Sequence, residues 1–459
     1  MPLSRAAAFL LAVVAAATLG PFPSGPAPAA TSRRPNVLII VTDDQRFDSL
    51  DVMPATDRWL ADAGTTFANA FVTTPLCCPS RGSIFTGRYA HNHAVTTNQN
   101  AQSMDPRATL QSYLGRAGYR TGIVGKYFNG IRVRRDPPQF DRWAIMKKGY
   151  RRATFNVDGR LERFRGYSTD FIARTTGGIL ADFERRDGSP WLMFVTPHAP
   201  HLPATPAVRH EGSSIPPWDP PPSVGEDRSD KPGFVADRGE PEMGFEQLRA
   251  LQLRSLMAVD DLVDRLMHRL AALGERDRTL VIFTSDNGYY WGEHGLDDKR
   301  LPYLEAARVP LLLRWPGHVP AGVMDHRLVA NVDIVPTVLQ AAGYAGRLRA
   351  PLDGRSLMGP DSRDRMLLEY WVDTARSDVP SWAAITTEEL QYVEYYASDG
   401  QTIVFQEYYD LGSDPWQLEN LLGDEDESND PTPAELTELS TRLAADRRCV
   451  GTAEPTACP

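Results

Sequence analysis

The chain has 459 residues, of which 24% are charged, and its formal net charge at pH 7 is −10. This acidic balance excludes a uniformly basic surface for nucleic acid, although a locally cationic pocket for an anionic substrate is compatible with it. The length is enough for one large hydrophobic core and a smaller second unit. We therefore expect no nucleic-acid partner.

Residues 1–30 have the composition of a secretory signal peptide. Arg5 precedes an apolar run over residues 6–19, and small residues and prolines follow up to an A-x-A-like end at residues 27–29. The run is too short for a membrane span and has the wrong flanking residues. We expect a secreted, extracellular protein without stable membrane insertion; an uncleaved amphipathic anchor is the alternative.

Four short apolar runs further along the chain each end at polar side chains. They lie in the stretches PNVLIIVTDDQ, YRTGIVGKYFN, WLMFVTPHAPH and RTLVIFTSDNG. Such runs suit strands buried on both faces of a parallel sheet, and the pattern over residues 247–273 suits a helix packed against that sheet. Ligands bind such sheets beyond the carboxyl ends of the strands. The polar residues at these ends are Asp43, Asp44, Lys126, His198, Asp286 and Asn287, while His201 is left on a loop without a role.

The order of these elements predicts the domain organisation. Residues 31–345 form a catalytic α/β domain, and residues 203–244 are a proline-rich insertion that is either part of the pocket rim or a disordered segment. Residues 346–447 indicate short antiparallel strands and then a helix over residues 433–447, a smaller α+β subdomain. In the tail, residues 448–459, export permits a disulfide between Cys449 and Cys458.

Paired acidic residues after a strand are often turn or cap residues. Two such groups at one sheet edge change the interpretation, because three carboxylates and an amide oxygen are hard ligands that suit calcium or magnesium rather than zinc. We expect a cation on Asp43, Asp44, Asp286 and Asn287, with calcium preferred over magnesium. Such an ion would attract and polarise an anionic ester.

The stretch TTPLCCPSRGSIFTGRY, residues 73–89, contains two of the four cysteines. Adjacent cysteines rarely reach disulfide geometry, and no zinc-ligand spacing accompanies them. A helix that begins at Cys77 would favour its thiolate through the helix dipole and Arg81, which predicts a reactive thiol. Cys78 is expected to be a small packed neighbour.

The same stretch resembles the signature of the sulfatase family, C-x-P-S-R followed by T-G-R. The offsets to Pro79 and Arg81 select Cys77 rather than Cys78 as the family cysteine. The resemblance extends from residue 35 to about residue 424 and includes VTDDQR, GKY, H-x-P, SDNG and DKRLPYLE. It implies an alkaline-phosphatase-like fold, a mixed and mostly parallel sheet flanked by helices, with an antiparallel sheet in the C-terminal subdomain.

The resemblance also implies the chemistry. In sulfatases this cysteine is oxidised to formylglycine by a formylglycine-generating enzyme, and its hydrate is the nucleophile. The metal set becomes Asp43, Asp44, Asp286, Asn287 and the converted Cys77. Arg81 and Lys126 would stabilise the hydrate. Lys126, His198 and Lys299 would bind the sulfate, with the last two protonating the leaving oxygen.

One position departs from the pattern of many sulfatases. Their G-K-x-H motif supplies a histidine base, whereas Phe128 stands at that place here and Asn129 follows it. The same form occurs in the branch that contains N-acetylglucosamine-6-sulfatases and extracellular heparan 6-endosulfatases, and bacterial arylsulfatases are also similar. His198, His91, His93 or water are left open as the replacement group, and Asn129 is a further possible site residue.

The resemblance implies hydrolysis of a sulfate monoester on a sulfated small molecule or glycan. The nearest branch points to 6-O-sulfated glucosamine. The alternatives are a broad arylsulfatase, a phosphate or phosphonate monoester hydrolase that uses formylglycine, and a non-catalytic protein that binds sulfated glycans.

Overall fold

The computed structural model describes residues 34–459 except 186–187, 240–242, 374–377 and 454. The expected signal peptide at residues 1–30 lies outside these residues. None of the helices in the described part of the chain combines the length and the apolar character that a membrane crossing requires.

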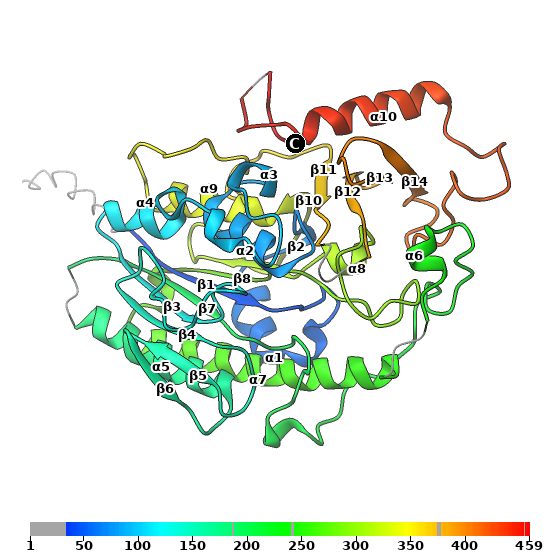
Figure 1. Cartoon of the computed structure of the whole chain (residues 1–459). Helices are drawn as coiled ribbons and strands as arrows, with labels where there is room; N and C mark the ends of the chain where they lie inside the picture. Colours follow the sequence, from blue (N-terminus) through cyan, green and yellow to red (C-terminus); the bar gives the residue numbers. More distant parts are fainter. Residues whose placement is uncertain (1–33, 186–187, 240–242, 374–377, 454) are drawn as a thin grey trace, which may run out of the picture. The chain divides into compact units, whose positions relative to one another are not determined.

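A ten-stranded sheet forms the centre of the large α/β part (Figure 1). Its strand order is β10 (Val323–Ala330), β2 (Thr65–Phe71), β9 (Leu311–Arg314), β8 (Thr279–Ser285), β1 (Asn36–Thr42), β7 (Trp191–Thr196), β3 (Arg120–Gly125), β4 (Arg142–Met146), β5 (Thr154–Val157) and β6 (Arg160–Arg163). The five strands from β8 to β4 are parallel, and β9, β5 and β6 are antiparallel to their neighbours. The predicted mixed, mostly parallel sheet is confirmed.

Alternate residues of β1 face two separate cores, as the period of a strand dictates. Leu38 and Ile40 belong to one core, with residues of α5 (Ser168–Glu184) and α7 (Phe245–Ala272). Val37 and Ile39 belong to the other core, on the opposite face. Three helices contribute to it: α2 (Cys77–Thr86), α4 (Leu110–Arg116) and α9 (Ile334–Ala341). Because both faces are covered, every residue of β1 is buried.

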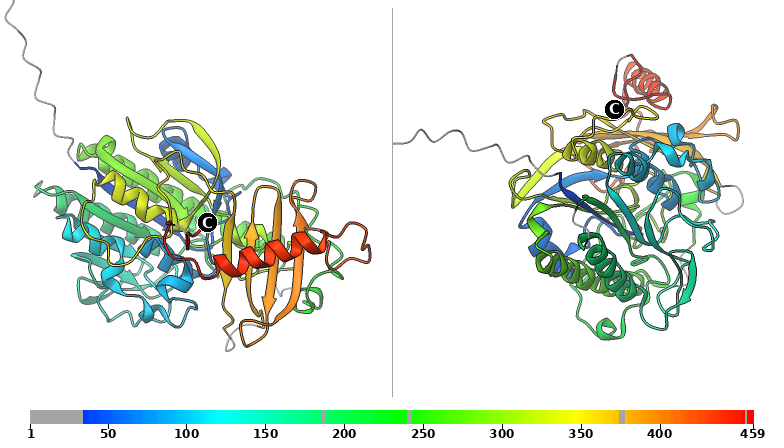
Figure 2. Two further views of the ribbon diagram at one scale, coloured as in Figure 1. Left: turned by 90° about the horizontal axis from the view of Figure 1, so that it is seen from above. Right: turned by 90° about the vertical axis from the view of Figure 1, so that its left-hand side faces the viewer.

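A four-stranded antiparallel sheet forms the smaller part, also as predicted. Its strands are β11 (Met366–Tyr370), β12 (Ser381–Thr386), β13 (Leu390–Tyr396) and β14 (Ile403–Asp410). Helix α10 (Pro433–Asp446) lies across one face of this sheet, where Leu443 is buried (Figure 2). The expected disulfide joins Cys449 and Cys458 beside the same face. The other face packs on residues of the large part, among them Tyr303.

Short elements complete the chain. The short α-helices are α1 (Pro54–Thr56), α3 (Ala90–His93), α6 (Gly233–Ala236) and α8 (Leu304–Ala307). A π-helix covers Asp57–Ala61, and the 3-10 turns are Leu50–Val52, Ala101–Ser103, Pro106–Ala108, Val208–His210, Arg276–Arg278 and Asn331–Asp333. The proline-rich insertion contains α6 and is joined to the loop after β8, because the Ser223 carbonyl accepts a hydrogen bond from the His294 amide.

Candidate active site

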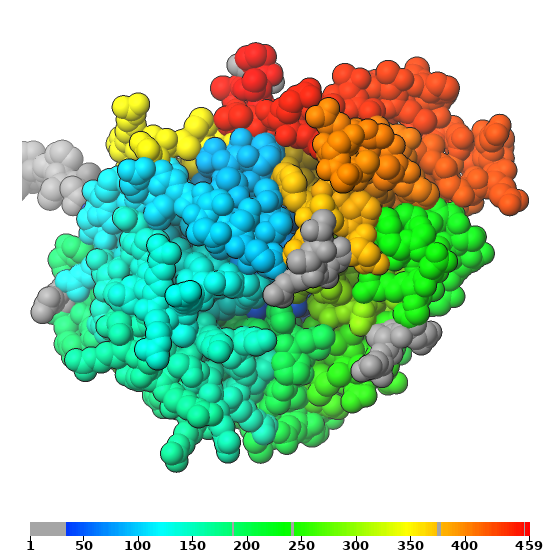
Figure 3. All heavy atoms as spheres, in the orientation of Figure 1, coloured from blue at the N-terminus to red at the C-terminus, as the bar shows by residue number. Residues whose placement is uncertain are grey.

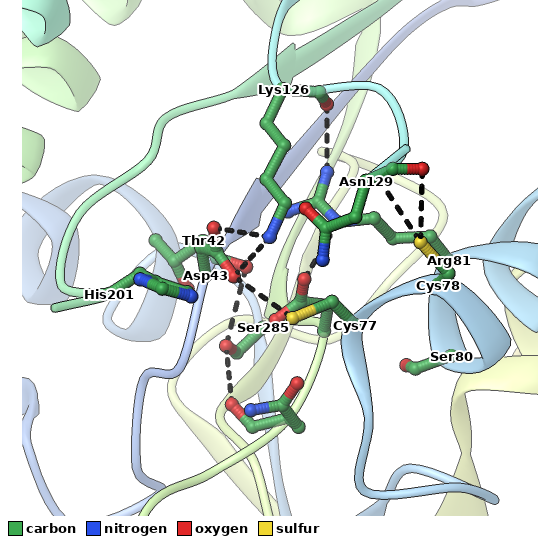
Figure 4. A network of polar contacts seen from close by, with 12 residues as sticks. Thr42, Asp43, Cys77, Cys78, Ser80, Arg81, Lys126, Asn129, His201 and Ser285 are labelled. Carbon is green, nitrogen blue, oxygen red and sulfur yellow. Dashed lines mark hydrogen bonds and ion pairs between the residues drawn. The ribbon is translucent and has the colours of Figure 1, made fainter. Parts of the chain in front are cut away.

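Polar side chains meet at the carboxyl edge of the large sheet. Asp43 and Asp44 follow β1, Lys126 follows β3, and Asp286 and Asn287 follow β8. Figure 4 shows Asp43, Lys126 and Cys77 directed toward one another from separate elements. The sequence-based expectation that the strand ends share one site agrees with this geometry.

The centre of this site is a buried cluster of three carboxylates and one thiol. One oxygen from each of Asp43, Asp44 and Asp286 and the Sγ of Cys77 all lie within 4.8 Å of one another. The Cys77 Sγ is 3.6 Å from Asp43 Oδ1. Helix α2 begins at Cys77, so the start of this helix carries the thiol directly into the cluster.

Three buried cations balance the three carboxylates. Lys126 Nζ is 2.6 Å from Asp43 Oδ2. Lys299 Nζ is 2.5 Å from Asp44 Oδ1. Arg81 Nε is 2.7 Å from Asp286 Oδ2, and its Nη1 donates to the Lys126 carbonyl. Ion pairs buried this deeply fix the relative positions of their partners, because either charge alone would be strongly destabilising.

Burial and charge act in opposite directions on these acids. Burial alone would raise the pKa of Asp43, but the ammonium of Lys126 and the neighbouring histidines hold it well below its ordinary value. Burial raises the pKa of Asp286 to about 6, and the Asp43 carboxylate adds to this shift. Burial and the adjacent Asp43 carboxylate therefore disfavour the charged form of Asp286, whereas Lys126 stabilises the charged form of Asp43.

Several buried polar atoms of the cluster have no hydrogen-bond partner in the described part of the chain. They are Asp44 Oδ2, Asn287 Oδ1 and Arg81 Nη2. Buried polar atoms are nearly always paired, so each such exception requires an explanation. Two unpartnered oxygens, one from a carboxylate of this cluster and one from the Asn287 amide, are suitable ligands for a divalent cation that prefers oxygen, such as calcium or magnesium. The arrangement of the predicted metal ligands therefore fits a bound cation of this kind.

The thiol of Cys77 differs from the sequence-based prediction of a reactive thiolate. Its side chain is 1% exposed, and burial raises its pKa to about 12 even though Lys126 and Lys299 act in the opposite direction. Desolvation thus outweighs the helix dipole and the nearby cations. Burial therefore favours the neutral thiol over the thiolate that the sequence predicted.

The two histidines after β7 occupy different positions. His198 is buried, and its Nδ1 lies 3.1 Å from Asp43 Oδ2. His201 stacks on His198, its side chain is 31% exposed, and its Nε2 lies 3.9 Å from Asp44 Oδ2. A nitrogen of His201 also lies within 4.8 Å of both Asp43 and Cys77.

Sequence reasoning gave His201 no role, yet the structure brings it to the cluster. The signal was present, because H-x-P occurs twice, at His198 and again at His201. The more exposed histidine is the better placed of the two to meet a substrate that enters from solvent.

The other candidate bases have structural partners. His91 Nδ1 lies 2.7 Å from Glu369 Oε2, and its Nε2 lies 3.0 Å from the Cys449 carbonyl, at the small sheet. His93 is buried, with its Nε2 3.2 Å from Ser83 Oγ and its Nδ1 accepting from the Val95 amide. His91 therefore has partners at the small sheet, and His93 has partners beside α2.

Phe128 and Asn129 lie beside the second cysteine. Phe128 packs on Phe85 in the core next to α2, so it cannot supply the proton transfer of a histidine. The Asn129 amide donates to Cys78 Sγ at 3.1 Å (Figure 4). Cys78 is fully buried among these groups, as expected of a packed neighbour.

Comparison with known proteins agrees with this geometry. Residues 35–344 match the family described as Sulfatase, and residues 292–445 match the one described as N-sulphoglucosamine sulphohydrolase, C-terminal. The extracellular sulfatase SULF-1 homolog of Drosophila melanogaster is 34% identical over 371 residues, which cover 75% of this chain and 33% of that protein. This chain therefore spans a third of that relative's length.

Two further proteins match along nearly the whole chain. The N-acetylglucosamine-6-sulfatase of Homo sapiens is 29% identical over 484 residues, covering 92% of this chain and 86% of that protein. A solved structure of a protein in complex with its substrate, D-glucosamine-2-N,6-O-disulfate, aligns with a TM-score of 0.78 at 25% identity. That alignment covers 90% of this chain and 97% of the other.

Proposed function

Since this chain belongs to the sulfatase family, we propose that it hydrolyses sulfate monoesters, with Cys77 converted to formylglycine, on 6-O-sulfated glucosamine units of glycans. The observation that carries the proposal is the position of Cys77. It begins α2 inside a carboxylate cluster where two oxygen acceptors, Asp44 Oδ2 and Asn287 Oδ1, have no partner in the part of the chain that the structure describes. A single buried site then combines a residue for covalent chemistry with ligands for a cation.

The acidic cluster and Cys77 would supply the anchor and the nucleophile. A divalent cation on Asp43, Asp44, Asp286 and Asn287, preferably calcium, would hold a sulfate oxygen beside the hydrated side chain of the converted residue 77. Because Cys77 is 1% exposed, the formylglycine-generating enzyme would have to act before this part of the chain folds.

The surrounding cations would stabilise the charge that develops on the sulfate. Among the described residues, Arg81 Nη2 is buried and has no hydrogen-bond partner, and the orientation of the guanidinium is fixed by Asp286 and the Lys126 carbonyl. Lys126 and Lys299 would bind sulfate oxygens once a cation takes over their carboxylate partners. Preorganised charges of this kind usually supply the largest share of catalysis.

The leaving oxygen needs a proton. His198 is held by Asp43, whereas His201 is partly exposed and is therefore the better donor to a bulky leaving group. We assign proton transfer to this histidine pair, with His201 nearer the leaving oxygen. Export through the signal peptide expected at residues 1–30 belongs to the same proposal.

Support for the substrate comes from the relatives. The human protein is named for N-acetylglucosamine 6-sulfate, and the aligned structure holds a glucosamine with a 6-O-sulfate. The decisive experiment compares turnover of glucosamine 6-sulfate, 4-nitrophenyl sulfate and 4-nitrophenyl phosphate by the converted protein. Preference for the first supports the proposal, preference for the second indicates an arylsulfatase, and preference for the phosphate would overturn the reaction assigned here.

A further inference from the structure

The basic residues of this acidic protein are concentrated in one segment. Residues 131–165, here called the basic segment, contain eleven Lys and Arg and four Asp and Glu, a formal charge of +7. The rest of the chain therefore carries −17. A local charge opposite in sign to that of the molecule creates a field that attracts anions to one region of the surface.

Most of these cations are not used in ion pairs. Among the described residues, only Arg142 and Arg151 of the eleven have carboxylate partners. Arg142 pairs with Asp158 and Asp182, and Arg151 pairs with Glu211. The other nine side chains are exposed. Unpaired cations at this density repel one another, so protein stability does not explain them.

The basic segment begins next to the active site. Strand β4 is parallel to β3, with Ile145 opposite Gly125, so Lys147 and Lys148 follow β4 at the sheet edge where Lys126 follows β3. Neighbouring strands lie about 4.8 Å apart. The next turn also contacts the histidine pair, because the Tyr150 ring lies 5.3 Å from the ring of His198.

A second part of the segment lines a cavity. The loop after Asn129 contributes Arg132, Arg134 and Arg135 to a cavity of about 750 Å³, together with the aromatic residues Tyr127 and Phe128. None of the first described residues lines this cavity; in Figure 3, atoms in the cyan-to-teal colours also border a hollow at whose base deep-blue atoms of those residues are visible. Both rings are buried, so the three arginines, with Asp136 beside them, form the exposed charged surface that an anionic sugar chain would meet.

Protection of a sheet edge explains only part of this pattern. Strand β6 is one of the two edge strands of the large sheet, and charged residues such as Arg160 and Arg163 keep such an edge from pairing with another chain. Lys147, Lys148 and the arginines at 132–135 lie in loops, where there is no edge to protect. Their charge requires a different reason.

We propose that the basic segment is a binding surface for a polyanionic, sulfated oligosaccharide whose reacting unit occupies the active site. This rests on the proposed function and narrows it, since the preferred substrate becomes a chain with further anionic groups rather than a small ester. Arginine binds sulfate and carboxylate through its planar fork, and several such contacts give strong salt dependence.

The test compares a sulfated hexasaccharide with glucosamine 6-sulfate. In Lys147→Ala/Lys148→Ala and in Arg132→Ala/Arg134→Ala/Arg135→Ala, the KM for the hexasaccharide should rise about tenfold, while kcat and the monosaccharide KM stay within about twofold. Raising salt from about 50 to 200 mM should remove most of the difference. The matched control is Arg442→Ala/Arg448→Ala at the end of α10, which removes two exposed cations and should change neither KM.

An unchanged hexasaccharide KM in both basic-segment variants would overturn the proposed binding surface. An equal rise in the KM for the monosaccharide would overturn it as well. An oligodeoxythymidylate of matched charge that competes equally well would also overturn it, because the surface would then be unspecific. If the wild-type protein hydrolyses neither substrate, the proposed function fails. Calorimetric binding of the hexasaccharide to Cys77→Ala protein then still tests the proposed binding surface. Binding that is lost in the combined basic-segment variants supports the surface, and binding that is retained overturns it.

Discussion

Buried carboxylates at two places in this molecule differ in how completely their oxygens are hydrogen-bonded. In the small sheet, Glu407 is fully buried, and both of its oxygens accept hydrogen bonds. Tyr303 donates at 2.9 Å and Tyr409 at 3.1 Å to Oε1, and Tyr395 donates at 2.8 Å to Oε2. At the edge of the large sheet, one oxygen of three equally buried carboxylates, Asp44 Oδ2, has no hydrogen-bond partner in the described part of the chain.

The difference separates a structural role from a functional one. Glu407 and its three tyrosines satisfy one another's hydrogen-bonding groups. They also join the small sheet to the large part through Tyr303, which precedes α8. The cluster at Cys77 is complete only with a further ligand. Burial alone therefore does not identify a site; at Cys77 the unpartnered oxygens Asp44 Oδ2 and Asn287 Oδ1 lie in one group with three carboxylates and a thiol.

The largest effect expected is at Cys77. Replacement Cys77→Ala should reduce sulfate-ester turnover at least about 10⁴-fold while the melting temperature changes little, because the side chain is small and the nucleophile is lost. Cys78→Ala is the matched control and should retain turnover within about threefold, with a modest loss of stability. Equal losses from the two replacements would show that the family cysteine has been assigned to the wrong position.

Removing the cation should be next in size. Asp44→Asn, or exhaustive treatment with a chelator, is expected to lower kcat about a thousandfold, because the sulfate loses its anchor and the carboxylates lose their counter-charge. Calcium added back should restore the chelated protein but not the variant, as measured by turnover and by bound metal. Full activity in metal-free protein would contradict the assignment of these oxygens.

Replacement of His201 tests whether the two histidines after β7 have different roles. His201→Ala should lower kcat on glucosamine 6-sulfate about a hundredfold, whereas 4-nitrophenyl sulfate, whose leaving group needs little protonation, should be affected much less. The control is His210→Ala, a histidine that pairs with Asp261 on α7. Equal losses on both substrates would assign His201 to sulfate binding instead.

Glu407 tests the structural side of the comparison. Glu407→Ala leaves three buried hydroxyls without an acceptor and should lower the free energy of unfolding by about 3 kcal/mol, with kcat unchanged below the melting transition. Chemical denaturation and turnover at one temperature measure both quantities. Tyr409→Phe, which removes one of the three donors, should cost about 1 kcal/mol.

The smallest effect concerns His91 and pH. Burial alone would lower its pKa, but the Glu369 carboxylate raises it from 6.5 to about 8. The charged pair therefore stabilises the fold fully below pH 6.5. This contribution to the free energy of unfolding, about 2 kcal/mol, is lost as the pH rises through 8. The stability difference between wild type and His91→Gln should shrink over this range; a constant difference would show that the pair is not charged.

The sequence alone was sufficient where local patterns decide. Apolar runs located the strands that hold Asp43, Lys126 and Asp286, and the tail predicted the Cys449–Cys458 disulfide, which is confirmed. Long-range packing decided the rest. The position of His201, the burial that raises the pKa of Cys77 and the meeting of Tyr303 with Glu407 each depend on segments far apart in the chain.

Mass spectrometry of the peptide that contains Cys77, taken from protein whose turnover of glucosamine 6-sulfate has been measured, tests the central claim most directly. We predict that residue 77 carries the mass of formylglycine and that the converted fraction rises in proportion to kcat across preparations. A preparation with full turnover and only free thiol at Cys77 would contradict the account.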